Sequence, residues 1–139
     1  MSAIYWSHIL TCLLWIIFLN ELNISYLHVF SYSERPNTEA ITLGGVVPAK
    51  ERERRSKMLR GLSEKKRRYF YEQHAGQEGT VIFENDIEDG KMHGFTENYI
   101  RVAAKYDPVL INEAKKVRLL HPNERGNMEV DELDEIVVH

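Results

Sequence analysis

Five short segments rich in β-branched and aromatic residues follow one another after Gly76, each separated from the next by a turn signal. They are TVIFEN, MHGFTE, YIRVAAKY, EAKKVRLLHP and NMEVDELDEIVV. Asp89-Gly90 tolerates the positive φ of a tight hairpin between the first two, and Asp107-Pro108 breaks the chain after the third. Five short strands in about 60 residues predict a small antiparallel β-barrel.

The stretch GKMHGFTENYIRV, residues 90–102, carries an unusual mixture of rings, cations and hydrogen-bonding groups for a strand at water. Small five-stranded barrels bind single-stranded or looped nucleic acid on a strand face, where aromatic rings stack on bases and cations hold the backbone. Gly94 would let a nucleotide or a neighbouring strand approach closely. The candidate RNA-binding residues of the barrel are Lys91, His93, Phe95, Thr96, Asn98, Tyr99, Arg101 and Lys105, with Tyr106 as a further ring.

Strand alternation ranks these candidates. Ile100 and Val102 alternate with Tyr99 and Arg101, so a period of two places the first pair inside the barrel and the second pair outside. Some rings must fill the interior of so small a barrel. Tyr99 and Arg101 are therefore better candidates than Phe95.

Charge is distributed unevenly along the chain, although the formal net charge is only -3. Residues 48–74 contain ten Lys and Arg against four Asp and Glu, whereas residues 75–139 contain seven against fourteen. Local asymmetry of this kind says more about partners than the total does. In the acidic tail, Val130, Leu133, Ile136, Val137 and Val138 favour a strand that closes the barrel, while the surrounding acids would repel RNA.

A long basic helix is predicted between Pro48 and Gly76, because proline suits a first helical turn and glycine a C-terminal stop. Its consecutive cations spread around the helix and would contact phosphates without reading bases. They are Lys65, Lys66, Arg67 and Arg68. The equal alternative is a solvated charged face that Glu–Arg pairs, such as Glu51 with Arg55, partly neutralise.

The apolar run from Ala3 to Leu19 is at the lower limit for a membrane-spanning helix. No Lys or Arg precedes Arg35, so the basic region of a secretory signal is missing. A buried helix is the simpler interpretation, and a membrane-tethered adaptor with a small cytoplasmic β domain is the alternative. The following segment, Ile24 to Phe30, is predicted to be a strand buried on both faces.

The sequence lacks signs of an independent catalytic or metal site. It contains no GxSxG motif, no phosphate-binding glycine loop and no CxxC pair. The acids before Gly90 fail as a calcium loop, because Ile87 would occupy a ligand position. Cys12 is the single cysteine, so no intrachain disulfide and no multi-cysteine metal site can form, which fits a reducing cytoplasm.

These residues resemble a known family. GFTENYIRV followed by EAKKVRLL is similar to the TRAM domain, a small OB-like RNA-binding barrel of radical-SAM tRNA methylthiotransferases. FLNELNISYLHVFSYSERPNTEA resembles the last helix end, strand and exit loop of their radical-SAM barrel, and VPAKERERRSKMLRGLSEKKRRYFYEQHAGQ resembles the helix that connects the two. The likeness runs from about Phe18 to about residue 130 and is greatest to the threonylcarbamoyladenosine branch.

The resemblance implies an α+β chain with four parts. They are a hydrophobic segment without a counterpart in the family (1–17), a radical-SAM barrel remnant (18–46), a basic linker helix (47–75) and the TRAM barrel (76–139). It further implies binding to the anticodon arm of tRNA, with no obligate protein partner. The enzymes of the family add a methylthio group beside the anticodon, using iron–sulfur clusters and S-adenosylmethionine.

This sequence departs from the family in two respects that matter. The clusters need cysteines in a CxxxCxxC arrangement and further cysteines in an N-terminal domain, whereas this chain has Cys12 alone. We therefore expect RNA binding without catalysis from a truncated or frame-shifted gene product. In the exit loop, Asn37 stands where the family usually has glycine.

Overall fold

The computed structural model describes residues 3–42 and 44–136 of the chain. The chain forms two compact units, one ending at Arg67 and the other beginning at Arg68. Helix α2, Ala49–Gln73, passes through this boundary.

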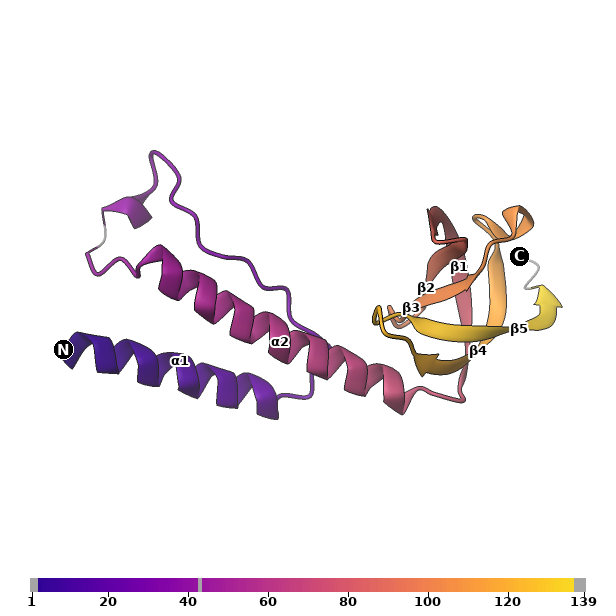
Figure 1. Cartoon of the computed structure of the whole chain (residues 1–139), viewed down its shortest axis with the longest axis horizontal. Helices are drawn as coiled ribbons and strands as arrows, with labels where there is room; N and C mark the ends of the chain where they lie inside the picture. The colour runs from indigo at the N-terminus through magenta and orange to yellow at the C-terminus, as the bar shows by residue number, and fades with distance from the viewer. Residues whose placement is uncertain (1–2, 43, 137–139) are drawn as a thin grey trace. The chain divides into compact units, whose positions relative to one another are not determined.

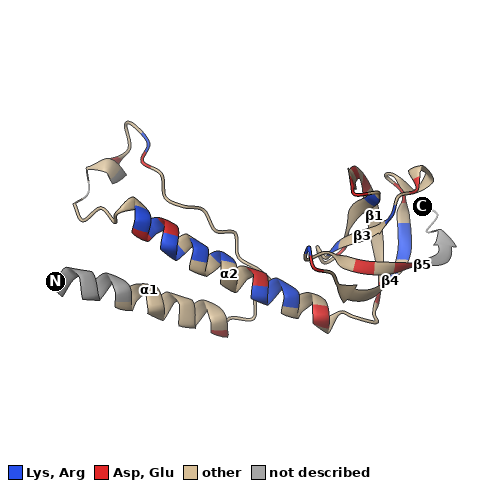
Figure 2. Ribbon diagram, viewed as in Figure 1, with Lys and Arg blue, Asp and Glu red and all other residues tan. Residues whose placement is uncertain are grey.

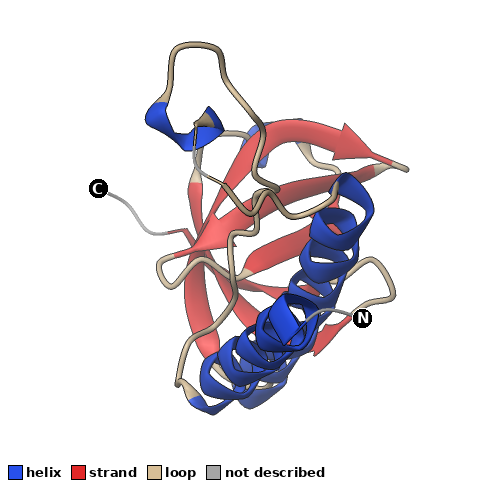
Figure 3. Cartoon of the chain, turned by 90° about the vertical axis from the view of Figure 1, so that its left-hand side faces the viewer, coloured by secondary structure: helices blue, strands red, loops and turns tan. Residues whose placement is uncertain are grey.

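The second unit is a closed five-stranded barrel, as the sequence predicts (Figure 1 and Figure 3). Its strands are β1 (Glu78–Glu88), β2 (Lys91–Thr96), β3 (Arg101–Lys105), β4 (Ala114–Pro122) and β5 (Met128–Ile136). Their order around the barrel is β1-β2-β3-β5-β4. Asp89 and Gly90 have φ of 50° and 74°, which confirms the predicted tight turn between β1 and β2.

One strand pair corrects the expectation of a fully antiparallel barrel. β3 and β5 run parallel, while the pairs β1–β2, β1–β4, β2–β3 and β4–β5 are antiparallel. A closed ring with an odd number of strands cannot alternate direction at every pair. Strands joined by a hairpin must be antiparallel. No hairpin joins β1 with β4 or β3 with β5, so the parallel pair must be one of these two, and in this barrel it is β3–β5.

Inward-facing side chains fill the barrel. Phe83, Val102 and Met128 are fully buried, and the strand register places Gly94 between the first two of them. A Cβ atom on Gly94 would lie 2.4 Å from the carbonyl oxygen of Ile82. Gly94 therefore accommodates the close approach of the neighbouring strand β1, and not of a nucleotide, the other role that the sequence allowed.

The predicted inward pair is confirmed. Ile100 and Val102 are both fully buried, whereas Tyr99 is 72% exposed. The same core receives Tyr71 from the last turns of α2, and this ring is 4% exposed. Its phenol oxygen accepts a hydrogen bond of 2.9 Å from the backbone N–H of Arg101. Tyr71 thus caps the start of β3 as well as packing the core.

The predicted basic helix is confirmed. The backbone N–H groups of Glu51 and Arg52 donate to the carbonyl oxygen of Pro48, so the first turn begins at the proline. Gly76 has φ of 81° and follows the end of α2. Its N–H donates to the carbonyl oxygen of Leu119 at 2.7 Å, which turns the chain from the helix into the barrel.

The first unit contains α1 (Ala3–Glu21), the short helix η1 (Glu39–Ile41) and the part of α2 up to Arg67. The strand predicted at 24–30 is wrong. That segment is a loop outside any sheet, because the described residues provide no neighbouring strand for it. Instead, the Ser63 hydroxyl accepts from Leu27 N–H at 2.8 Å and donates to Leu27 C=O at 2.9 Å.

Asn37 in the following loop has φ of 65°, the left-handed conformation that glycine adopts without strain. Asparagine is among the residues that tolerate this region best. The substitution therefore keeps a backbone conformation that glycine would also provide.

The apolar N-terminal segment is helical, but its expected burial is wrong. In α1, Leu10, Leu14 and Trp15 are 61%, 58% and 58% exposed within the chain. Among the residues that the structure describes, no helix combines the length and the apolar character needed to cross a membrane.

Candidate nucleic-acid interface

The strand register brings most of the predicted barrel residues to one side of β2 and β3. Lys91 pairs with Lys105 and Phe95 pairs with Arg101, with His93 between them opposite Ala103. Alternate residues of a strand point to the same face. Because Met92 and Gly94 are buried toward the core, these residues lie on the opposite side of the two strands, and we call this surface the β2–β3 face.

Exposed apolar groups extend this face toward β1. Ile82 pairs with Phe95 across β1 and β2, and the two side chains are 56% and 38% exposed. Tyr99 lies in the turn before β3 with φ of 62°. Phe95, ranked lower from the sequence, is thus the ring in register with Arg101, while Tyr99 occupies the connecting turn.

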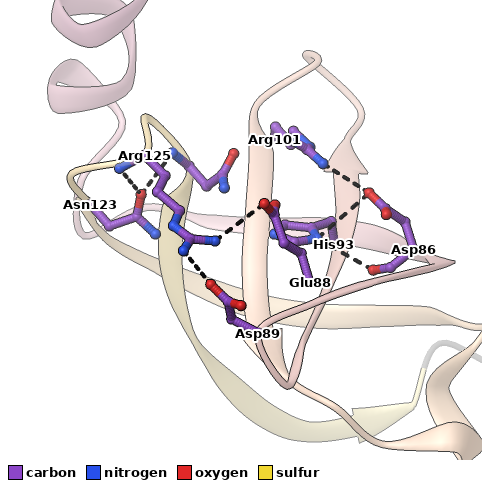
Figure 4. Close-up of polar contacts among 8 residues, drawn as sticks. Asp86, Glu88, Asp89, His93, Arg101, Asn123 and Arg125 are labelled. Carbon is purple, nitrogen blue, oxygen red and sulfur yellow. Dashed lines mark hydrogen bonds and ion pairs between the residues drawn. The ribbon is translucent and has the colours of Figure 1, made fainter.

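A carboxylate from β1 lies against the cations of the β2–β3 face. The pairing of β1 with β2 is irregular between Phe83 and Ile87, and Asp86 is within that irregular segment. Its Oδ2 atom is 2.8 Å from a terminal nitrogen of Arg101 and 3.6 Å from Nδ1 of His93 (Figure 4). The sequence pattern did not indicate this contact, because it depends on the irregular pairing.

A second carboxylate is held more firmly at the other end of the face. Glu129 Oε1 is 2.7 Å from Nζ of Lys91 and accepts a bond of 2.6 Å from the Asn123 amide. Partial burial acts to raise the pKa of Glu129, but the hydrogen bonds from Asn123 and Lys91 outweigh it and the pKa is below its ordinary value. Lys91 is therefore an integral part of the barrel's own structure.

An open pocket of about 340 Å³ adjoins this pair. Arg125, from the turn between β4 and β5, forms ion pairs there with Glu88 and Asp89 of the β1–β2 hairpin (Figure 4). The pocket is lined by Glu88, Asp89, Lys91, His93, Ala103, Asn123, Glu124, Arg125, Asn127 and Glu129. Four carboxylates of the lining, Glu88, Asp89, Glu124 and Glu129, face two cations, Lys91 and Arg125, so the pocket is negatively charged and disfavours an anionic ligand.

Two predicted contact residues are not exposed as expected. His93 is 3% exposed and lies beneath Asp86, whose carbonyl oxygen is 3.3 Å from Nδ1. Thr96 is 5% exposed; its hydroxyl accepts from the N–H of Ile100 at 2.9 Å and donates to Oδ1 of Asn98 at 2.5 Å. Thr96 and Asn98 thus shape the turn that presents Tyr99.

Three of the four predicted phosphate-binding cations of α2 have partners within the chain, and Figure 2 shows acidic residues interspersed among the basic ones along this helix. Lys66 donates to the carbonyl oxygens of Asn20 and Leu22, at 3.0 and 2.7 Å. Arg67 pairs with Glu64 at 2.6 Å and Arg68 with Glu72 at 2.9 Å, while Lys65 is exposed. Lys65, Lys66 and Arg67 belong to the unit that ends at Arg67.

The same compensation occurs earlier in α2. Arg54 and Arg55 donate to Glu51, and these hydrogen bonds lower the pKa of Glu51 to about 2. The predicted pair of Glu51 with Arg55 is confirmed at 2.8 Å. Ion pairs along one helix therefore neutralise part of its positive charge, as the alternative interpretation of this helix holds.

The residues present do not fit an iron–sulfur cluster. Cys12 is the only cysteine, so the thiolates that such a cluster requires are not in this sequence. Among the described residues, no group of three or more His, Cys, Asp or Glu side chains is placed to hold a metal ion.

Comparison with known proteins agrees with the resemblance found in the sequence. No family model matches the chain. It is 39% identical over 85 residues to the threonylcarbamoyladenosine tRNA methylthiotransferase MtaB of Aquifex aeolicus, covering 61% of this chain and 20% of that protein. The protein of the same name from Bacillus subtilis is 29% identical over 129 residues, covering 88% of this chain and 29% of the relative.

A third protein of this name, from Rickettsia prowazekii, is 37% identical over 82 residues, which cover 59% of this chain and 18% of that relative. The chain thus spans less than a third of the length of each of these relatives. All three matches are to proteins of the same name. The chain is similar to a fragment of an MtaB-like threonylcarbamoyladenosine tRNA methylthiotransferase.

Proposed function

We propose that this chain binds tRNA through the β2–β3 face, as the C-terminal, RNA-holding portion of an MtaB-like methylthiotransferase. The observation that carries the proposal is the register of Phe95 with Arg101, which sets a partly exposed ring beside a partly exposed guanidinium on neighbouring strands. Proteins hold unpaired nucleotides with such a combination of stacking surface and positive charge.

Each group has a distinct role in this proposal. The ring of Phe95, continued by Ile82, provides the surface on which an unstacked base lies, and Tyr99 offers a second ring from the adjoining turn. Arg101 and the exposed Lys105 contact phosphates. Affinity should therefore fall steeply with salt, because each phosphate contact releases condensed counterions.

The names of the relatives indicate the RNA. They are described as acting on threonylcarbamoyladenosine in tRNA, and we propose that this barrel holds the anticodon arm of tRNA in the cytoplasm. We assign binding alone to the residues of this chain, because a single cysteine leaves a cluster without its ligands.

The proposal can be tested by titrating the full chain with a fluorescent anticodon stem–loop RNA at two salt concentrations. Arg101→Ala should weaken binding by about 1.5–3 kcal/mol, the value of one hydrogen bond to a charged group. Phe95→Ala should weaken it by about 1–3 kcal/mol through lost base stacking.

Arg118→Ala is the matched control. Arg118 is an exposed arginine of the same barrel that pairs with Glu78 at 2.9 Å, but it lies on β4. The three variants should keep the circular dichroism of the parent chain. Equal losses from Arg101→Ala and Arg118→Ala would mean that binding is diffuse, and the β2–β3 face would then not be the site.

A further inference from the structure

Asp86 occupies the position on the β2–β3 face that an anionic ligand would take. One carboxylate oxygen, Oδ2, lies 2.8 Å from Arg101 and 3.6 Å from Nδ1 of the buried His93. A phosphate oxygen makes contacts of the same kind with arginine and histidine side chains. Figure 4 shows both side chains directed toward Asp86.

This carboxylate can be displaced at small cost. The side chains of Arg101 and Asp86 are 37% and 50% exposed, and exposed ion pairs add little to stability. The pair of Lys91 with Glu129 differs, because Glu129 is 23% exposed and is also bonded to Asn123. Of the two carboxylates on this face, Asp86 is therefore the one that can leave without disrupting a hydrogen-bonded network.

We propose that an RNA phosphodiester replaces the Asp86 carboxylate at Arg101 and His93, so that Asp86 is an internal competitor that limits affinity and excludes weak anions. This inference rests on the proposed function and adds the regulation of its site. The irregular pairing of β1 makes this competition possible, because it places the Asp86 carboxylate over the β2–β3 face. No covalent step is involved.

Asp86→Asn tests the proposal in the full chain with the same stem–loop RNA. The amide keeps the shape of the side chain but removes its charge, so affinity should rise about twofold to fivefold. The matched control is Glu78→Gln, which removes the same charge and frees Arg118 from a pair of equivalent length. That control should change affinity by less than Asp86→Asn.

The decisive variant is Asp86→Asn combined with Arg101→Ala. If Asp86 competes for Arg101, the gain from Asp86→Asn disappears once the arginine is absent. If the gain persists there, Asp86 merely repels RNA, and the proposal of competition is overturned. A loss of affinity on Asp86→Asn alone would also overturn it, because Asp86 would then position Arg101 for binding.

The outcomes separate this inference from the function on which it rests. Parent-chain binding that depends on Phe95 and Arg101, together with no gain from Asp86→Asn, keeps the function and refutes the competitor. Absence of binding by every variant refutes both. Should Asp86→Asn unfold the barrel, the carboxyl carbon resonance of Asp86 in the parent chain decides: RNA must shift it toward that of an unpaired aspartate.

Discussion

Replacing Gly94 by alanine should destabilise the barrel strongly, although the change adds only one methyl group. The new Cβ would lie 2.4 Å from the carbonyl oxygen of Ile82, 2.8 Å from Cγ1 of Val81 and 3.0 Å from the carbonyl carbon of Ile82. Two of the three contacts are with backbone, which cannot rotate away. Relief requires β1 and β2 to separate by about 1 Å, against a normal spacing of about 4.8 Å.

That separation lengthens the hydrogen bonds on either side of Gly94. Overpacking costs about 1–3 kcal/mol and the two weakened ladder bonds about 1 kcal/mol each, which together give about 3–5 kcal/mol. Replacing glycine also reduces the entropy of the unfolded chain, which offsets about 0.4–1 kcal/mol and leaves a net loss of about 2–4.5 kcal/mol.

Amide hydrogen exchange of β2 and β3 measures this loss residue by residue. The slowest amides should exchange about 30-fold to 1,600-fold faster in Gly94→Ala, because each 1.4 kcal/mol of lost stability is a factor of ten. The control is Gly61→Ala in α2, where the added Cβ meets no atom within 4 Å. It should stabilise the helix by about 0.5–1 kcal/mol. Unchanged or slower exchange in Gly94→Ala would refute the steric argument.

Two further predictions concern stability. Tyr71→Phe removes the acceptor for the N–H of Arg101 and should cost about 1–3 kcal/mol, seen as a lower urea midpoint of the barrel; an unchanged midpoint would mean that water replaces the phenol oxygen. The pKa of Glu129 is lower in the folded chain than its ordinary value of 4.5. Its ionised form therefore stabilises the fold at pH values above 4.5, and this stability is lost as the pH falls through the pKa of the folded state. Glu129→Gln should therefore be less stable than the parent chain near neutral pH, and urea midpoints measured well below pH 4.5 should converge; a constant difference would contradict the assigned pairing with Lys91.

Local sequence patterns predicted what a segment's own backbone and nearest neighbours decide. The five strands, the turn at Asp89-Gly90, and the inward placement of Ile100 and Val102 all follow from alternation and turn chemistry. The limits of α2 follow in the same way from Pro48, which precedes the helix, and Gly76, which follows it. These features need no knowledge of distant residues.

The strand predicted at 24–30 failed for the opposite reason. A buried strand requires hydrogen-bonding neighbours, and its composition cannot show whether they exist. Here, the Ser63 hydroxyl forms hydrogen bonds with both the N–H and the C=O of Leu27. The sequence does not indicate that a serine in a basic helix has this role. The apolar run in α1 likewise predicted a helix without predicting what covers it.

The arrangement of the candidate site was determined partly by sequence and partly by tertiary structure. The sequence by itself determined the residue types of the β2–β3 face, because an alternating strand fixes which side chains share a side. Only the closed barrel decided that Phe95 lies in register with Arg101, that β3 pairs parallel with β5, and that His93 is covered. Only the irregular pairing of β1 brought Asp86 to Arg101. Such contacts join residues far apart in the chain, and their geometry depends on how the ring of strands closes rather than on the local preference of any one strand.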